Sequence, residues 1–288
     1  MATLPRQDLI VSANLATPPW YYSDGMEILI LPSPDAAEKL AARLVADRLR
    51  AKPDLVLGCA TGRSMEGIYR ELSRMHRDDG LDFSGVRTFN LDEYVGLAPS
   101  DPRSYHSYMR EHLFDAVNID LSNTRIPNGA AEDLEGEARQ YEALIASVGG
   151  IDLQMLGLGS TGHIGFNEPL SSLMSRTREK ALAPATRRQN APMFGGDENA
   201  VPKRALTMGV GTILDAREIL MVVTGAHKAD ILARATEGPI TSMVSATALQ
   251  LHPHCVVLVD EAAAAELQGK DHYKWQFENE PEWAAYRS

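Results

Sequence analysis

The stretch IDLQMLGLGSTGHIGFNEP, residues 151–169, decides the fold. Its first half, 151–158, is an apolar run of strand length, and its second half is a glycine-rich turn that contains His163 and Glu168. In open parallel sheets, ligands bind beyond the carboxyl ends of the strands. The stretch therefore predicts a buried strand that delivers polar side chains to a ligand site at one edge of a sheet.

Strand-like and helix-like segments alternate on both sides of this stretch. Strands that alternate with amphipathic helices favour parallel strands joined by crossover helices, and hence an α/β fold. We predict strands at 27–31, 54–58, 86–91, 151–158, 219–224 and 255–259, and helical segments at 34–50, 65–75, 105–114, 132–148, 227–235 and 245–251.

The chain divides into a core and two ends. Residues 26–270 contain no internal repeat and no Gly/Ser linker, so we predict a single domain there. Residues 1–25, with three prolines and the run WYY, predict an extended arm that docks on another subunit, or a plain tail. The aperiodic segment 181–201 is either a lid or a surface loop. The aromatic, acidic tail at 271–288 could cover a neighbouring subunit or the protein's own sheet edge.

Composition excludes several classes of protein. The 288 residues include 28 Lys+Arg and 39 Asp+Glu, a net charge of −11, which argues against a basic face for nucleic acid. No apolar run approaches the ~20 residues of a membrane helix. The two cysteines, Cys59 and Cys255, lie in apolar runs and suit a reducing compartment. We predict a cytoplasmic protein that binds neither nucleic acid nor membrane.

Two predicted strand ends offer groups that can bind an anion. The turn CATGRS at 59–64 opens a helix, so its backbone N–H groups could hold a phosphate, or its Thr and Gly could serve turn geometry alone. Lys228 follows another strand and is either a point charge for an anion or a solvated lysine.

Two further strand ends offer acid/base groups. Asp92 and Glu93 end a strand, where a carboxylate can act as a general base or cap a helix. His163 and Glu168 share a glycine-broken loop, so they could form a proton shuttle. No second His or Cys lies at ligand spacing, so we predict no metal site.

Taken together, these segments resemble the glucosamine-6-phosphate deaminase (isomerase) family across residues 26–270. The matching stretches include LGCATGRS, TFNLDEYVGL, IDLQMLGLGSTGHIGFNEP and VPKRALTMGVGTILDAREILMVVTGAHKA. The resemblance implies a modified doubly wound, Rossmann-like, mostly parallel sheet with helices on both faces. It implies no cofactor and a sugar phosphate as the small-molecule partner. It assigns Asp92 as the carbon-to-carbon base, His163 with Glu168 as the ring-opening pair, and Thr61, Gly62, Ser64 and Lys228 as the phosphate cradle.

Four positions depart from the family pattern. Thr161 stands where the family has Asp or Asn two residues before the histidine, and a hydroxyl can orient an imidazole without offsetting its charge. Pro192 falls at the place of a phosphate-binding arginine in the lid, and Met65 replaces a proline. Arg63 occupies a small-residue position and, with Arg187 and Arg188, could supply the missing guanidinium.

Some family members bind an allosteric sugar phosphate between subunits. Ser171, Ser172, Arg178 and Lys180 match the anion-binding part of that site, whereas Lys274 falls at the place of its tyrosine. The resemblance also implies a homo-oligomer.

The sequence thus predicts an enzyme that converts a hexosamine 6-phosphate, glucosamine 6-phosphate or an epimer, to a ketose 6-phosphate and ammonia. Two alternatives stay open: an isomerase for a different acidic sugar, such as a galacto epimer or a non-phosphate anion, and an inactive sugar-phosphate-binding regulator. A lactonase of the related phosphogluconate family is disfavoured by the Asn167-Glu168-Pro169 ending.

Overall fold

A parallel β-sheet forms the centre of the molecule in the computed structural model, which describes residues 25–287. Seven of the described strands lie in the order β1-β10-β9-β6-β2-β3-β5, and every neighbouring pair is parallel. The strands are β1 (Gly25–Leu31), β2 (Val56–Cys59), β3 (Arg87–Asn90), β5 (Thr124–Arg125), β6 (Leu153–Gly157), β9 (Glu218–Val223) and β10 (His254–Asp260). The predicted α/β class is confirmed.

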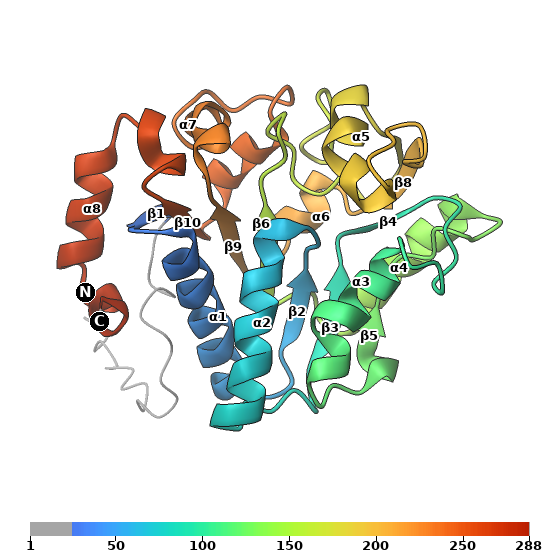
Figure 1. Ribbon diagram of the computed structural model, residues 1–288, viewed down its shortest axis with the longest axis horizontal. Coiled ribbons are helices and arrows are strands. Elements are labelled where there is room, and N and C mark those ends of the chain that lie inside the picture. The colour runs from blue at the N-terminus through green and yellow to red at the C-terminus, as the bar shows by residue number, and fades with distance from the viewer. Residues whose placement is uncertain (1–24, 288) are drawn as a thin grey trace, which may run out of the picture.

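Helices flank this sheet (Figure 1). Helices α1 and α2 pack side by side, and α1 also contacts β1, β9 and β10. Their bounds are α1 (Pro34–Ala51), α2 (Arg63–Asp79), α3 (Tyr105–His112), α4 (Leu134–Ser147), α5 (Pro184–Asn190), α6 (Val210–Leu214), α7 (Ala229–Thr236) and α8 (Lys270–Asn279). Short 3₁₀ turns complete the chain: η2 (Phe114–Ala116), η3 (Leu121–Asn123), η4 (Ala191–Phe194), η5 (Ala226–Lys228), η6 (Ser245–Leu251), η7 (Ala263–Glu266) and η8 (Pro281–Tyr286).

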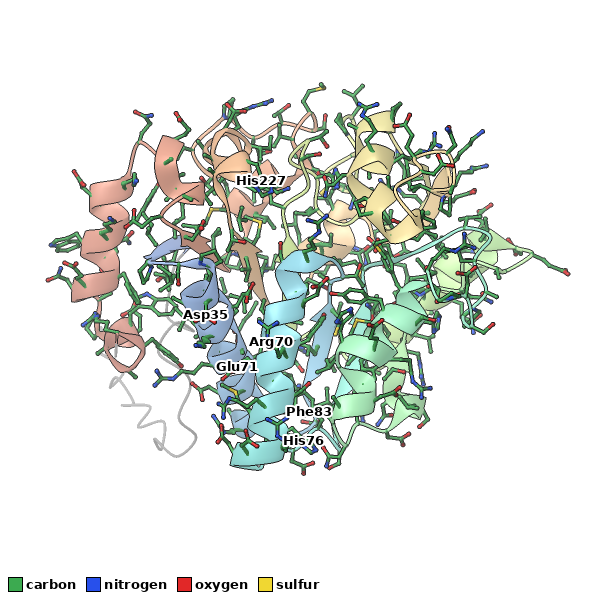
Figure 2. All side chains as sticks on the ribbon, viewed as in Figure 1. Asp35, Arg70, Glu71, His76, Phe83 and His227 are labelled. Carbon is green, nitrogen blue, oxygen red and sulfur yellow. The ribbon has the colours of Figure 1, made fainter. Side chains whose placement is uncertain are left out.

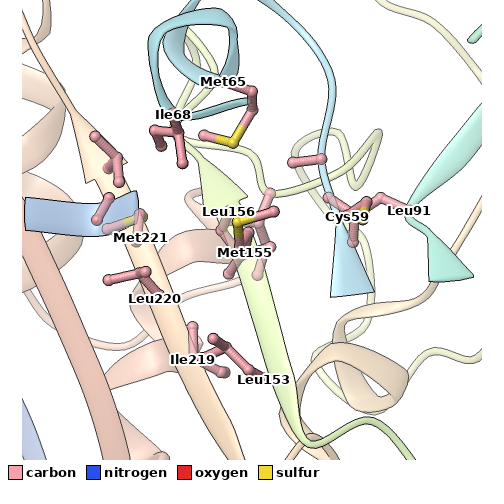
Figure 3. Packing of buried hydrophobic residues seen from close by; sticks show 14 of the residues in the cluster. Cys59, Met65, Ile68, Leu91, Leu153, Met155, Leu156, Ile219, Leu220 and Met221 are labelled. Carbon is pink, nitrogen blue, oxygen red and sulfur yellow. The ribbon is translucent and has the colours of Figure 1, made fainter. Parts of the chain in front are cut away.

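The strands are apolar because both faces of the sheet are covered, as is usual for parallel sheets. Every residue of β9 is buried, and six of the seven residues of β10 are buried. Figure 3 shows Met65 and Ile68 of α2 above the side chains of β6. Met65 is fully buried. The methionine that departs from the family pattern is therefore a core residue.

A second, antiparallel sheet contains β4 (Asp92–Tyr94), β8 (Arg204–Thr207) and β7 (Arg178–Ala181), in that order. The sequence does not predict this sheet, because these strands are three or four residues long and β7 has no buried residue. β4 follows β3 after Leu91 alone, so the small sheet begins at the carboxyl edge of the large one.

The structure describes only one of the two ends of the chain for which predictions were made, the C-terminal tail. The predicted arm lies outside the described residues, apart from Gly25. The tail folds onto the protein's own sheet edge: α8 contacts β1, and the fully buried Trp283 donates from Nε1 to Glu27 Oε2 at 2.5 Å. Among residues 25–287, no helix is both long and apolar enough to cross a membrane.

Three segments differ from their predicted secondary structure. The segment predicted to be aperiodic, 181–201, contains α5, which begins with Pro184 at its first turn and continues into η4. Residues 245–251, predicted to be helical, form a 3₁₀ turn, and the helix predicted at 227–235 begins at Ala229.

Candidate active site

The candidate residues lie at the carboxyl ends of four neighbouring strands. In the order β9-β6-β2-β3, these strands lead to Lys228, His163, the turn at 61–64, and Asp92. Adjacent strands lie about 4.8 Å apart, so the four ends span about 14 Å. The sheet topology therefore places segments that are distant in sequence along one edge.

The loop after β6 folds tightly around the ring of His163. Gly159 N–H donates to the backbone oxygen of His163 at 2.9 Å, and Gly162 has a φ of +77°. A Cβ atom at position 159 would lie 2.2 Å from His163 Nε2. The sequence predicts that these glycines admit a ligand, but at Gly159 the group that approaches the backbone is the imidazole itself.

His163 is 6% exposed, and its Nδ1 faces two oxygen atoms. Thr161 Oγ1 lies 2.9 Å from Nδ1, and Glu168 Oε2 lies 3.8 Å from it. Burial lowers the pKa of His163, the nearby charge of Lys228 lowers it further, and Glu168 opposes both effects. Burial therefore favours the neutral form of the imidazole, whose Nδ1 faces the hydroxyl of Thr161.

The two carboxylate oxygens of Glu168 have different surroundings. Its Oε1 accepts a hydrogen bond from the backbone N–H of Ala183 at 2.9 Å. Its Oε2 is buried and has no hydrogen-bond partner among the described residues. A desolvated oxygen beside an imidazole can stabilise the protonated ring when a proton arrives.

Asp92 lies beside the same loop. A Cβ atom at Gly165 would lie 3.5 Å from Asp92 Oδ2 and 3.0 Å from Thr207 Oγ1. Thr207 pairs with Asp92 across β4 and β8, and its Oγ1 accepts from Phe166 N–H at 3.0 Å. Burial raises the pKa of Asp92 to about 8, with a smaller contribution from the charge of Glu93. Asp92 is thus a desolvated carboxyl group next to the loop of His163.

The carboxylate of Glu93 accepts hydrogen bonds from three backbone N–H groups. Its carboxylate accepts from the N–H groups of Tyr94 at 2.8 Å, Tyr105 at 2.9 Å and His106 at 3.3 Å. Tyr105 and His106 are the first residues of α3, so Glu93 caps that helix. Of the two roles open for this carboxylate pair, the capping role therefore belongs to Glu93.

No side chain caps α2 at the turn before it. Gly62 has a φ of +102° and gives the helix no side-chain cap. Tyr108 OH donates to the backbone oxygen of Gly62 at 2.9 Å, which fixes the turn. Thr61 and Ser64 are half-buried, and Arg63 is exposed. A 17-residue helix whose N-terminus has no side-chain cap favours an anion at this end.

Lys228 is a buried cation. It is 9% exposed, and its Nζ donates to the backbone oxygen of Leu158 at 2.7 Å, where β6 ends and the His163 loop begins. Figure 2 places the neighbouring His227 at this upper edge of the molecule. Burial lowers the pKa of Lys228. The alternative of a solvated lysine is therefore wrong.

The structure does not bring Arg187 and Arg188 of α5 to these residues. Arg188 is exposed and lies 4.0 Å from Glu198, and Arg187 donates to the backbone oxygen of Glu198 at 2.6 Å. Pro192 is exposed in η4. Arg187 and Arg188, which were predicted to supply the guanidinium missing at Pro192, therefore contact Glu198 instead.

The four residues matched to an allosteric site are spread over the loop after Glu168 and over β7. Ser171 is buried, Ser172 Oγ accepts from Met174 N–H at 3.2 Å, and Arg178 donates to Asn167 Oδ1 at 2.7 Å. A cavity of about 370 Å³ between α4 and β7 borders Arg178 but none of the other predicted site residues. Lys180 lies in β7, and Lys274 pairs with Glu261 at 2.5 Å.

The sequence did not indicate four residues that contact the predicted site. Thr207 links Asp92 to the loop, and Tyr94, Gln189 and Asn190 join α5 to the site. Thr207 falls inside the matching stretch RALTMGVG, which could have identified it. Within residues 25–287, no group of three or more His, Cys, Asp or Glu side chains could hold a metal ion.

Comparison with known proteins gives the family. Residues 33–258 match the family model described as glucosamine-6-phosphate isomerases/6-phosphogluconolactonase. A glucosamine-6-phosphate deaminase of Arthrobacter sp. (strain FB24) is 48% identical over 258 residues, which cover 90% of this chain and 99% of that protein. The chain belongs to the glucosamine-6-phosphate deaminase family. The deaminase of Hahella chejuensis is also 48% identical, over 87% of this chain and 95% of its own length.

Among the solved structures, a deaminase matches this chain with a higher identity and TM-score than a lactonase does. A monomeric glucosamine-6-phosphate deaminase is 44% identical, with a TM-score of 0.82, and the match covers 84% of this chain and all of that one. The 6-phosphogluconolactonase of Trypanosoma brucei matches with a TM-score of 0.66 at 21% identity, over 85% of this chain and all of that one, and so shows the fold alone.

Proposed function

We propose that this member of the glucosamine-6-phosphate deaminase family converts glucosamine 6-phosphate to fructose 6-phosphate and ammonia. One observation carries the proposal: Asp92 at the start of β4 lies against the short loop that contains His163 and Glu168, so the carboxyl group and the imidazole can both reach one open-chain sugar. The curated relatives at 43–48% identity, which are glucosamine-6-phosphate deaminases, support it.

Each candidate group has a task in this reaction. We assign the phosphate to the turn before α2 and to Lys228, since a helix N-terminus and a buried cation both favour an anion. Arg63 extends from the same turn and adds positive charge there. The phosphate cradle is thus Thr61, Gly62, Arg63, Ser64 and Lys228.

His163 opens the sugar ring by carrying a proton between the ring oxygen and the hydroxyl of carbon 1. Because Thr161 holds Nδ1, the proton exchanges at Nε2, and Glu168 Oε2 stabilises the imidazolium as it forms. Thr161 accepts or donates at Nδ1 and so keeps the ring oriented in both protonation states.

Asp92, as a carboxylate, removes the proton from carbon 2 and returns it to carbon 1. The ammonium group on carbon 2 gives one proton, through water, to the oxygen of carbon 1, so that a C=N double bond forms at carbon 2 and a hydroxyl at carbon 1. Water then adds to carbon 2 and ammonia leaves, so that the ketone of fructose 6-phosphate remains. Every proton moved in this scheme is carried by Asp92, His163 or water.

The alternatives have less support. A different acidic sugar is motivated by Arg63 and by Pro192, yet Arg63 is exposed and makes no contact that distinguishes one anion from another. An inactive regulator would not need a desolvated carboxyl group beside the loop of a buried imidazole. The lactonases share the fold at 14–21% identity only.

The experiment is an ammonia-release assay on the Asp92→Asn variant. Turnover should fall about 10²–10⁴-fold, because the amide cannot accept the proton from carbon 2. Binding of glucosamine 6-phosphate, measured by calorimetry, should persist. The matched control is Asp115→Asn, at a half-exposed carboxylate paired with Arg110, which should keep wild-type turnover. Wild-type turnover by Asp92→Asn would rule out its assignment as the base.

The homo-oligomer, the cytoplasmic location, the lid at 181–201, the allosteric set and the substrate contact of Arg188 stay predictions. Support for an oligomer comes from the resemblance, while the solved relative is monomeric. Buried, unpaired thiols at Cys59 and Cys255 suit a reducing compartment.

A further inference from the structure

Helix α5 contacts the candidate site at both of its ends. Next to its first residue, the backbone N–H of Ala183 donates to Glu168 Oε1 at 2.9 Å. At its other end, Gln189 Oε1 accepts from Ser160 N–H at 3.1 Å, in the loop that contains His163. The helix therefore holds the carboxylate partner of the histidine and the loop of the histidine at once.

The last residue of α5 reaches the strand of Asp92. Asn190 Nδ2 donates to Tyr94 OH at 2.9 Å, and Tyr94 lies two residues after Asp92 in β4. Tyr94 OH also accepts from Tyr105 OH at 3.3 Å, inside a cluster of buried aromatic rings. Because the ring of Tyr94 is buried, its hydroxyl is a fixed anchor for the helix.

We propose that Gln189 and Asn190 are positioning residues, which fix the His163 loop and the Asp92 strand relative to each other from a single turn of α5. The inference rests on the proposed function and deepens it. The two side chains are adjacent in a seven-residue helix, so a displacement of one displaces the other. Neither needs to touch the substrate, because each acts through a backbone or side-chain group of the site.

Steady-state kinetics on glucosamine 6-phosphate test this role. Gln189→Ala and Asn190→Ala should each lower kcat about 5-fold, the effect expected for one lost hydrogen bond between neutral groups, with KM changed less than about 2-fold. A residue that only binds substrate would raise KM and leave kcat unchanged. That result would overturn the proposal.

Three further variants make the test specific. Gln189→Glu keeps the oxygen that accepts from Ser160 and should restore kcat. Asn199→Ala removes an exposed side chain of the same type in the same segment and should leave kcat unchanged. In the Tyr94→Phe background, Asn190→Ala should lower kcat no further, because Tyr94→Phe has already removed the hydrogen bond that Asn190 donates. Additive losses, or failure of Gln189→Glu to restore kcat, would contradict the assignment.

Amide hydrogen exchange separates this inference from the proposed function. Exchange in residues 159–168 should be about 5-fold faster in Gln189→Ala than in the wild type or in Asn199→Ala. Faster exchange together with a wild type that releases no ammonia would reject the proposed substrate and retain the role of α5. Unchanged exchange would overturn that role.

Discussion

Burial of Asp92 has a direct consequence for the pH range of the enzyme. A carboxyl group in a dry site prefers its neutral form, and here the pKa is raised to about 8. Asp92 can accept the carbon-bound proton only as a carboxylate, which is its form above that pKa. Activity should therefore decline as pH falls through the pKa of Asp92.

We predict that the negative charge of Glu93 contributes to the pH at which activity rises. The log of kcat/KM should rise with pH and level off near pH 8 in the wild type. Glu93→Gln removes the neighbouring negative charge that raises the pKa of Asp92, so the rising limb should move to lower pH. The pH dependence of kcat/KM measures this shift, and a limb that stays in place would show that burial alone sets the pKa.

Gly159 should be essential because of the ring it faces. In Gly159→Ala the new methyl group would lie 2.2 Å from His163 Nε2, so the imidazole must move by about an ångström. A displacement of that size costs about 10²-fold in turnover. Gly157→Ala is the matched control, since a Cβ there meets nothing within 4 Å. Equal activity of the two variants in the ammonia assay would refute the contact.

Six of the seven strands of the large sheet could be predicted, because their residues are apolar over the length of a strand, whereas the two-residue β5 (Thr124–Arg125) was not predicted. Runs such as EILMVV in β9 are apolar over the length of a buried strand. The small sheet could not be predicted: REKA in β7 carries no apolar alternation, and it forms only because β8 pairs with it. Helix α5 is too short for periodicity to reveal it, although Pro184 is well placed as a first helical residue.

The same distinction applies to the site. His163, Glu168 and Asp92 were identifiable because they follow predicted strands inside long family motifs. Gln189 and Asn190 were not, because their roles depend on a hydrogen bond to Ser160 and to Tyr94, which lie far away in sequence. The predicted cation at Arg188 faces Glu198, a contact that no pattern in the sequence indicates.

The C-terminal tail should act as a structural element. Trp283→Ala removes a fully buried ring and its hydrogen bond to Glu27, so the free energy of unfolding should fall by about 3–5 kcal/mol. Trp275→Ala, at a ring in α8 that is 54% exposed, is the matched control and should change it by less than about 0.5 kcal/mol. Urea unfolding measures both, and equal small losses would show that the tail adds little stability.

At the scale of the whole molecule, sheet order explains how a chain with a net charge of −11 can bind an anion. Positive character is local, at the turn before α2 and at Lys228, on two strand ends separated only by β6. The acid/base groups lie in the loop after β6 and just after β3. One substrate molecule can therefore lie across four strand ends, with its phosphate and its reacting carbons held by different parts of the fold.

The most direct measurement is a crystal structure of the Asp92→Asn variant soaked with glucosamine 6-phosphate. The account predicts one sugar, with carbons 1 and 2 beside residue 92, the ring oxygen or its open-chain hydroxyl beside His163 Nε2, and the phosphate between the turn before α2 and Lys228. A sugar that contacts residue 92 or His163 but cannot reach both would contradict it.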